Sequence, residues 1–227
     1  MLLFQENQEL LDEVSQEKTL SIYNLIMDGG VGGQIIIAIL FVLLAVALYI
    51  YFERFFAIKS ASQVDKDFMN QIRDHITNGK LESARSLCSN TDTPTARLIG
   101  KGISRIGKPL DDINTAIENA GKLEVYKLDR NVSVVATIAG AAPMIGFLGT
   151  VIGMIVAIHE IANSGGQIDI KMLSDGLYTA MTTTVAGLIV GIVAYIAYNH
   201  LVVRTDKVVY QMEAKSVEFL DLLNEPV

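Results

Sequence analysis

A run of twenty uncharged residues, Gly33 to Phe52 (GQIIIAILFVLLAVALYIYF), limits this chain more than any other feature. At 1.5 Å per residue, a helix of this length is about 30 Å long, which matches the hydrocarbon core of a bilayer. Two further apolar runs follow, at residues 132–161 and 177–203. Three such runs predict an all-α integral membrane protein with three transmembrane helices.

The composition agrees with a membrane protein and excludes several other classes. Only 19% of the residues are charged, whereas an average soluble domain has about 25%. A formal net charge of −7 and the lack of a basic stripe argue against a nucleic-acid partner. The single cysteine, Cys88, excludes an intrachain disulfide. The first twenty residues lack the basic start and the cleavage site of a signal peptide, so we expect them to be retained.

The basic residues are unevenly distributed around the three runs. Thirteen of the 18 Lys and Arg residues lie in residues 53–131, and three lie in residues 204–227. Residues 1–32 and 162–176 carry one each. Because cytoplasmic loops are enriched in Lys and Arg, we expect residues 53–131 to form a cytoplasmic domain and residues 204–227 a cytoplasmic helix. The acidic N-terminal segment, 1–32, and the loop 162–176 are then periplasmic.

The predicted cytoplasmic segment has helical patterns and no convincing strand. Thr93 followed by Pro94 matches an N-cap with proline at the first helical position. From Pro109 onward, the apolar spacing continues into the second run without a helix breaker. We therefore expect one unbroken helix from Pro109 to Ile161, about 80 Å long, that extends well below the membrane.

No motif for enzymatic chemistry is convincing. The stretch Gly102 to Pro109 (GISRIGKP) nearly fits the phosphate-binding loop G-x-x-x-x-G-K-[ST], but Pro109 replaces the magnesium-binding hydroxyl and no strand precedes the loop. The three histidines show no metal-ligand spacing: His75, His159 and His200. No paired carboxylates or Ser/His/Asp arrangement supports hydrolysis. We expect no cofactor, no metal and no enzymatic activity.

The second and third runs each carry a stripe of small residues. The stripes are Ala142, Gly146, Gly149 and Gly153 in the second run, and Ala180, Thr184, Gly187 and Gly191 in the third. Steps of four, three and four residues place each stripe on one helix face. Small residues let helix backbones approach closely in lipid, so both stripes predict tight helix packing, within a subunit or between subunits. We expect Pro143, next to the first stripe, to bend its helix.

Four threonines in the same two runs are the candidate lining of a polar passage: Thr150, Thr184, Thr179 and Thr183. A helical threonine often bonds a carbonyl of its own helix, which is the competing structural interpretation. None of the three runs has a charged residue in its interior; Glu160 lies at the outer end of the second. Proton relays normally need an ionisable group near the middle of the membrane. If this chain works with protons, another polypeptide must supply the carboxylate.

At these residues the chain resembles the ExbB/TolQ family, relatives of the flagellar stator subunit MotA. The matching pieces are ERFFAI, APMIGFLGTVIGM and LSDGLYTAMTTTVAGLIVGIVAYIAYN, and the resemblance covers roughly Gly33 to Leu201. It implies a homopentamer in the bacterial inner membrane whose pore encloses the single transmembrane helices of two ExbD or TolR chains. An aspartate of that partner takes up protons. The resulting work reaches an outer-membrane transporter through TonB, or the Tol–Pal envelope system.

The resemblance also assigns roles to individual positions. Thr150 and Thr184 match the family's pore-lining threonines. Thr179 stands where the family often has a glutamate, and residues 191–193 (GIV) lack a proline that is often found there. We expect hydroxyls and ordered water to replace the missing glutamate. The stripe at 142–153 is expected to form a smooth wall around the enclosed partner helix.

Two other functions stay open beside this one. A self-sufficient channel or transporter is disfavoured because the runs carry no interior charge, and a structural scaffold is disfavoured only by the threonines. Within the family, three runs argue against MotA, which has four. The acidic segment 1–32 favours ExbB over TolQ.

Overall fold

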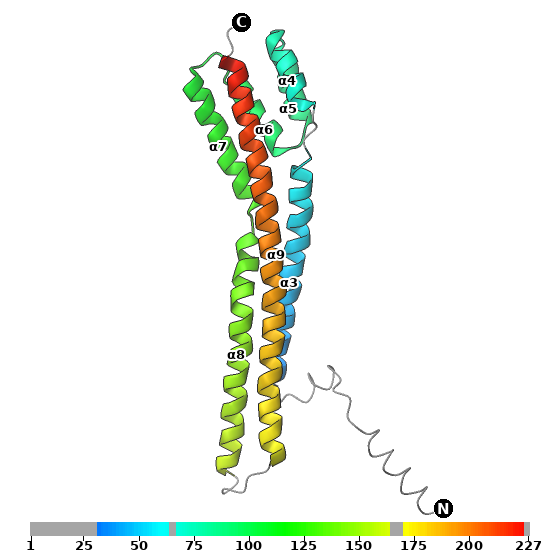
Figure 1. Ribbon diagram of the computed structural model, residues 1–227, viewed down its shortest axis with the longest axis vertical. Helices are drawn as coiled ribbons and strands as arrows, with labels where there is room; N and C mark the ends of the chain where they lie inside the picture. Colours follow the sequence, from blue (N-terminus) through cyan, green and yellow to red (C-terminus); the bar gives the residue numbers. More distant parts are fainter. Residues whose placement is uncertain (1–30, 64–66, 164–169, 225–227) are drawn as a thin grey trace, which may run out of the picture. The chain divides into compact units, whose positions relative to one another are not determined.

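The computed structural model describes residues 31–63, 67–163 and 170–224, and every regular element in these ranges is an α-helix. Nearly all of the predicted N-terminal segment lies outside the described residues. The helices, labelled as in Figure 1, are α3 (Val31–Ala61), α4 (Phe68–Thr77), α5 (Leu81–Asn90), α6 (Pro94–Ile103), α7 (Leu110–Leu128), α8 (Val132–Asn163) and α9 (Ile170–Asn224). The all-α prediction is confirmed for the part of the chain that the structure describes.

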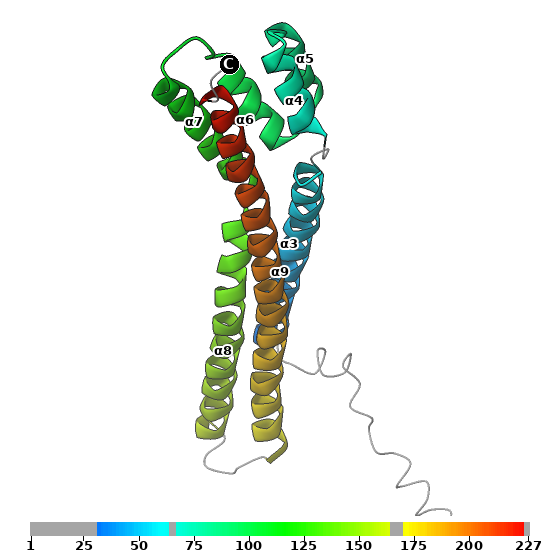
Figure 2. The same ribbon diagram turned by 45° about the horizontal axis from the view of Figure 1, so that its top comes forward.

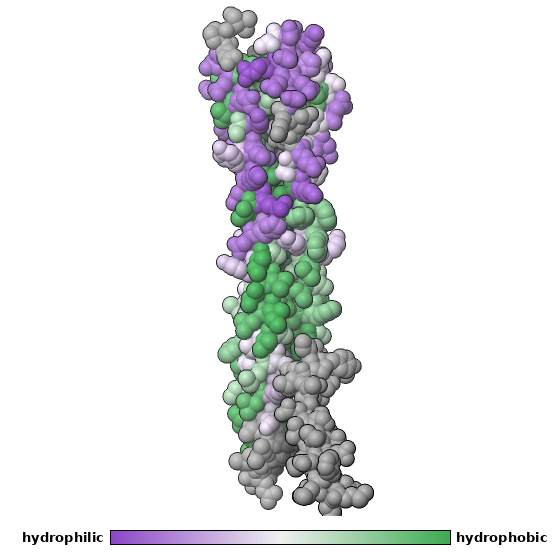
Figure 3. Space-filling view, turned by 45° about the vertical axis from the view of Figure 1, so that its right-hand side comes forward, coloured by the Kyte–Doolittle hydropathy of each residue, from purple (hydrophilic) through white to green (hydrophobic). Residues whose placement is uncertain are grey.

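Among the described residues, the three helices α3, α8 and α9 are long and apolar enough to cross a membrane. Hydrophobic side chains gather over these stretches on the face that Figure 3 shows, while hydrophilic ones gather over the other helices. Helix α9 has 55 residues and is therefore about 80 Å long, far longer than a hydrocarbon core of about 30 Å. The chain is a multi-pass membrane protein, and α9 continues beyond the membrane as one helix.

The chain divides into two compact units, and each is described by itself. The first unit takes in the described residues up to Leu43 together with Ala141–Gly191. The second unit takes in Leu44–Gly140 and the chain from Ile192 onward, and so contains α4 to α7. The stripes and the candidate threonines all fall in the first unit.

The core of the second unit joins α4 and α6 to the C-terminal part of α9 (Figure 2). Ile72, Ile99 and Phe219 are fully buried there. Gly102, from the loop-like motif GISRIGKP, lies against this core, and a Cβ on it would come within 2.6 Å of the Phe219 ring and 2.8 Å of Ile117. The glycine is therefore needed for packing under Phe219.

The N-terminus of α6 follows the predicted signal. The Thr93 hydroxyl accepts a hydrogen bond from the Ala96 N–H at 3.3 Å, and Pro94 occupies the first helical position. This side chain satisfies one of the N–H groups that a helix leaves free at its start. The predicted cap is confirmed.

The expected unbroken helix from Pro109 to Ile161 is wrong. Helix α7 ends at Leu128 and α8 begins at Val132. Between them Asn131 has a φ of 63°, a left-handed conformation that ends a helix and that asparagine tolerates better than most residues. The apolar spacing continues across this break, which is why it is not visible in the pattern.

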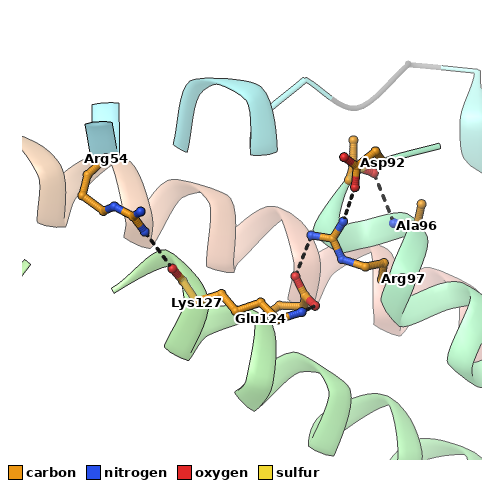
Figure 4. A network of polar contacts seen from close by, with 7 residues as sticks. Arg54, Asp92, Ala96, Arg97, Glu124 and Lys127 are labelled. Carbon is orange, nitrogen blue, oxygen red and sulfur yellow. Dashed lines mark hydrogen bonds and ion pairs between the residues drawn. The ribbon is translucent and has the colours of Figure 1, made fainter. Parts of the chain in front are cut away.

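Polar contacts secure the C-terminal end of α7 (Figure 4). Arg54 of α3 donates a hydrogen bond to the Lys127 carbonyl at 3.1 Å, one of the carbonyls that the end of a helix leaves without a partner. The Glu124 carboxylate accepts hydrogen bonds from Lys127 and Arg97, both at 2.7 Å. Arg97 also pairs with Asp92 at 2.6 Å. Helices α3, α6 and α7 are thus joined by charged groups.

The charge state of Glu124 follows from these contacts. Burial alone would raise the pKa of the Glu124 carboxyl, but the hydrogen bonds and positive charges of Arg97 and Lys127 outweigh burial and hold this pKa below its usual value. The carboxylate is therefore ionised at neutral pH. Among the residues that the structure describes, removing it would leave Arg97 paired with Asp92 alone.

A second set of contacts joins α3 to α9 in the second unit. The Tyr51 hydroxyl lies 2.8 Å from His200 Nδ1, and Arg204 donates to His200 Nε2 at 2.9 Å. The Arg204 guanidinium also stacks on the Phe55 ring, 4.6 Å from its centroid. His200 therefore has a structural role between two helices.

Candidate functional site

Helices α8 and α9 pack together in the first unit through the two predicted stripes (Figure 1). Added Cβ atoms on Gly187 and Gly146 show how close the backbones come. A Cβ on Gly187 would lie 2.6 Å from the Ala142 carbonyl and 2.8 Å from Gly146 Cα. A Cβ on Gly146 would lie 2.7 Å from the Thr183 carbonyl. Only glycine fits at these two positions.

The contact continues along both helices toward the α8–α9 connection. A Cβ on Gly149 would collide with the Thr183 side chain, and one on Gly153 would lie 3.1 Å from the Gly176 carbonyl and 3.2 Å from Ala180 Cβ. We call this contact, from Ala142 to Gly153 on α8 and from Gly176 to Gly187 on α9, the α8–α9 seam. Gly191, the last residue of the predicted second stripe, is also buried.

The seam changes the role expected for the α8 glycines. Gly146, Gly149 and Gly153 were expected to form a smooth wall around a partner helix. The side of each glycine where a Cβ would stand instead faces α9 of the same chain. That expectation is wrong for these three residues, because α9 already fills the space that their missing side chains leave. Helix α8 also continues through Pro143 without a break.

The four candidate threonines fall into two groups. Thr183 is fully buried; it lies against Gly149, and its hydroxyl donates to the Ala180 carbonyl at 2.8 Å. A Cβ added to Gly33 of α3 would lie only 2.5 Å from the methyl group of Thr179. Thr179 and Thr183 therefore lie at packing contacts with α3 and α8. The burial of Thr183 removes it from any surface that could line a passage.

Thr150 and Thr184 form the other group, and their hydroxyls bond the carbonyls of two neighbouring α8 residues, Phe147 and Gly146. The Thr184 hydroxyl donates to the Gly146 carbonyl across the seam at 3.2 Å. In an α-helix that same carbonyl accepts the N–H of Thr150, four residues on. The Thr150 hydroxyl donates to the Phe147 carbonyl at 2.6 Å. Both side chains are half-buried.

This arrangement has a definite chemical capacity. A threonine hydroxyl that donates to a carbonyl keeps its oxygen lone pairs free to accept a hydrogen bond. Thr150 and Thr184 can therefore bind water or the O–H of a protonated carboxyl group. Neither hydroxyl titrates near neutral pH, so the site can orient a proton carrier but cannot hold the proton itself.

One packing residue of the site was not predicted. Gly33, at the start of the first apolar run, lies against Thr179 and within 3.9 Å of Thr183 if a Cβ is added. The pair Gly32-Gly33 in an otherwise bulky run was the available signal. Small residues in membrane helices mark close contacts, and the same argument that identified the other stripes applies here.

The fold and the seam together define a class: an all-α, multi-pass membrane protein whose spans are packed through glycine and threonine and carry no interior charge. Residues 90–214, more than half of the chain, match the MotA/TolQ/ExbB proton channel family. The chain belongs to this family.

Relatives within the family bear two kinds of name. The chain is 39% identical to the biopolymer transport protein ExbB of Helicobacter pylori, over 35% of this chain and 54% of that one. It is 35% identical to ExbB of Aquifex aeolicus, over 44% and 69%. It is 32% identical to the Tol-Pal system protein TolQ of Haemophilus influenzae, over 57% and 51%. The chain spans about half the length of most of the curated relatives that it matches.

Proposed function

We propose that this chain is the channel subunit of a proton-driven motor of the ExbB type, which works without a carboxylate of its own. Five copies surround the transmembrane helices of an ExbD- or TolR-type partner, and an aspartate of that partner carries the proton. The motor energises TonB-dependent transport across the outer membrane. It sits in the bacterial inner membrane with its N-terminus in the periplasm and its C-terminus in the cytoplasm.

The observation that carries this proposal is the hydrogen bond from the Thr184 hydroxyl to the Gly146 carbonyl across the seam, one turn of α8 before Thr150. Two hydroxyls with free lone pairs, next to a tightly packed seam, can solvate a carboxyl group that moves past them. The spans have no Asp, Glu, Lys or Arg in their interior that could do the same work. A partner carboxylate is therefore the simplest completion of the site, because proton relays in membranes depend on such groups.

The position of Thr179 supports different roles for the threonines of α9: Thr179 packs against α3, and Thr184 serves the proton path. Thr179 stands where the family often has a glutamate, and here it packs near Gly33 of α3. A glutamate at that place would have to be accommodated against α3. In this chain, helix packing takes the place of the second carboxylate, and the hydroxyls of Thr150 and Thr184 with ordered water serve the partner's aspartate.

The orientation in the membrane is part of the proposal. Thirteen of the 18 basic residues lie in residues 53–131, and cytoplasmic segments are enriched in Lys and Arg. This distribution assigns α4 to α7 and the end of α9 to the cytoplasm. Residues 1–32 and the connection between α8 and α9 then lie in the periplasm.

A TolQ-type subunit of the Tol–Pal system is the second candidate. The match to TolQ of Haemophilus influenzae, at 32% identity, favours it. Both candidates share the same use of the seam. They differ in the partner that receives the work, and growth tests that separate iron uptake from envelope integrity distinguish them.

The experiment that tests the seam is proton flux through the purified complex in liposomes. Replacing both Thr150 and Thr184 by valine keeps the shape and removes both hydroxyls, and we expect flux to fall at least about tenfold, as for loss of roughly 1.4 kcal/mol of stabilisation of the proton in transit. Serine at both positions should preserve flux. Thr137→Val is the matched control, because its hydroxyl bonds Ser133 of its own helix away from the seam. Unchanged flux in the double valine variant would contradict the proposal.

A further inference from the structure

The hydrogen bonds of His200 define the protonation state of its ring. Arg204 donates from its Nε–H to His200 Nε2 at 2.9 Å, and an arginine side chain can only donate. His200 Nε2 therefore carries no hydrogen. A neutral imidazole has one N–H, which is then on Nδ1, so His200 donates to the Tyr51 hydroxyl at 2.8 Å. The ring that makes both bonds is the neutral form.

Both side chains of this α9 pair also touch α3. The centroid of the His200 ring is 5.8 Å from that of Tyr51 and 5.9 Å from that of Phe55. The Arg204 guanidinium carbon lies 4.6 Å from the centroid of Phe55. All four residues belong to the second unit. We call them the His200 cluster, and it is a contact between α3 and α9.

A second proton on the His200 ring is incompatible with this arrangement. The new Nε2–H would point at the Nε–H of Arg204, with 2.9 Å between the two nitrogens, and two positive charges would be in contact. If the guanidinium withdraws, it leaves the Phe55 ring; if the imidazole turns away, it leaves the Tyr51 hydroxyl. Protonation therefore removes a contact between α3 and α9 whichever side chain moves.

The charged groups of α3 and α8 do not offset the second positive charge. On α3, Arg54 pairs with Glu53 and donates to a carbonyl of α7. The part of α8 in the second unit, residues 132–140, has no titratable residue. Among the residues that the structure describes, Arg204 forms no ion pair with a carboxylate.

The charged groups of α7 and α9 lead to the same conclusion. Asp129 and Asp206 lie near each other, because burial and then the charge of Asp206 raise the pKa of the Asp129 carboxyl. Asp206 is six residues beyond His200 and therefore about 120° around α9 from it. Lys207 is seven residues beyond and lies on nearly the same face as His200, but it adds another positive charge.

We propose that His200 is a pH-sensitive switch of the contact between α3 and α9, which is complete with the neutral ring and loses a part when the ring is protonated. Histidine is the side chain that ordinarily changes charge between about pH 5 and 8. The contact is therefore present at higher pH and is lost as the pH falls and the ring takes up its second proton. One consequence rests on the proposed function: His200 lies toward the cytoplasm, where the motor releases protons, so cytoplasmic acid loosens the contact.

Thermal melting of the purified full chain tests this switch. In the background His75→Gln plus His159→Gln, His200 is the single histidine of the chain. Lowering the pH from about 7.5 to about 5.5 should lower the melting temperature of this background. Adding His200→Gln should make that decrease smaller by about 2–4 °C, because the glutamine oxygen can accept from Arg204 but takes up no proton.

A variant of Arg204 separates the switch from a merely structural contact. The amide of Arg204→Gln can donate to the neutral ring and can accept from the protonated one. This variant should therefore lose the acid response of the background, although His200 still titrates. A structural role alone would lower the melting temperature equally at both pH values and keep the response.

Hydrogen exchange in residues 51–56 of α3 provides the local measurement. After correction for the intrinsic effect of pH, exchange should rise in acid in the background and stay level after His200→Gln, because a lost tertiary contact lowers the cost of local opening.

Three results would overturn the proposal. They are an equal acid shift with and without His200→Gln, an undiminished shift in Arg204→Gln, and unchanged exchange in residues 51–56. All of these measurements use the chain without its partner and without proton flux. Their failure leaves the proposed function intact, and an absence of proton flux in liposomes leaves the switch intact.

Discussion

The Thr184 hydroxyl and the Gly146 carbonyl are joined by a hydrogen bond of 3.2 Å between α9 and α8. This hydrogen bond crosses a seam that is otherwise made mainly of small residues. It fixes the Thr184 side chain against α8, one turn before Thr150, and the proposal assigns these two hydroxyls to the path of a partner's proton. Packing and proposed conduction thus depend on the same residue.

Single substitutions of Thr184 separate these two roles. Thr184→Val removes the hydrogen bond to Gly146 and should destabilise the seam by about 1 kcal/mol. Thr184→Ser keeps the hydroxyl and should restore proton flux more fully than it restores stability, because the methyl contact is lost. Thermal denaturation in detergent and flux in liposomes, measured on the same preparations, check this. Parallel recovery of both quantities would show that the hydroxyl acts only in packing.

The seam also predicts an unequal response of two glycines on the same helix. In Gly146→Ala the new Cβ would come within 2.7 Å of the Thr183 carbonyl and 3.0 Å of Gly187 Cα. Both neighbours are backbone and cannot move aside, so we expect a loss of about 1–3 kcal/mol. Gly140→Ala has no atom within 4 Å of its Cβ and should be neutral or slightly stabilising. The melting temperatures of the two variants provide the measurement, and equal values would contradict the seam.

The apolar spans and the seam could be predicted from the sequence for physical reasons. A bilayer forbids interior charges and unpaired backbone groups, so the uncharged run at 33–52 has few alternatives to a spanning helix. Close helix contact in lipid needs small residues, so the spacing from Ala142 to Gly153 identified a packing face. What covers that face could not be predicted, because any helix with a matching stripe fits it.

Which of the threonines are buried also could not be predicted from the sequence. Thr183 and Thr184 are neighbours in the chain, yet one is fully buried and the other half-buried beside Thr150. The difference depends on how α8 and α3 pack against α9, because Thr183 lies against Gly149 and a Cβ on Gly33 would lie 3.9 Å from it. Long-range packing of this kind leaves no periodic signal in the chain.

The break between α7 and α8 predicts a specific tolerance at Asn131. Its φ of 63° suits glycine and is strained for a β-branched residue. Asn131→Gly should leave stability within about 0.5 kcal/mol of the parent, whereas Asn131→Val should lose about 1–2 kcal/mol. Thermal denaturation of both variants tests this. A valine variant as stable as the parent would indicate a continuous helix.

The Glu124 network predicts a dependence of stability on pH. The pKa of Glu124 is lower in the folded protein than its ordinary value of 4.5, so its contribution is complete above that value and is lost as the pH falls through the folded-state pKa. Glu124→Gln should lower the free energy of unfolding by about 1–3 kcal/mol near neutral pH. The variant should also lack part of the parent's loss of stability in acid.

The control for this prediction is Asp221→Asn, which changes an exposed carboxylate outside the network. Melting temperatures from pH 3.5 to 7 should follow the parent in this variant. If Glu124→Gln and Asp221→Asn give the same pH curve, the pairing of Glu124 with Arg97 and Lys127 does not stabilise the fold.

The central claim, that this chain conducts protons only with a carboxylate from a partner, is tested most directly by proton flux into liposomes. The chain is reconstituted alone, with its single-span partner, and with that partner after its membrane aspartate is changed to asparagine. We predict flux with the intact partner and none in the other two cases, because the spans of this chain have no Asp, Glu, Lys or Arg in their interior. Proton flux through the chain alone would contradict the account.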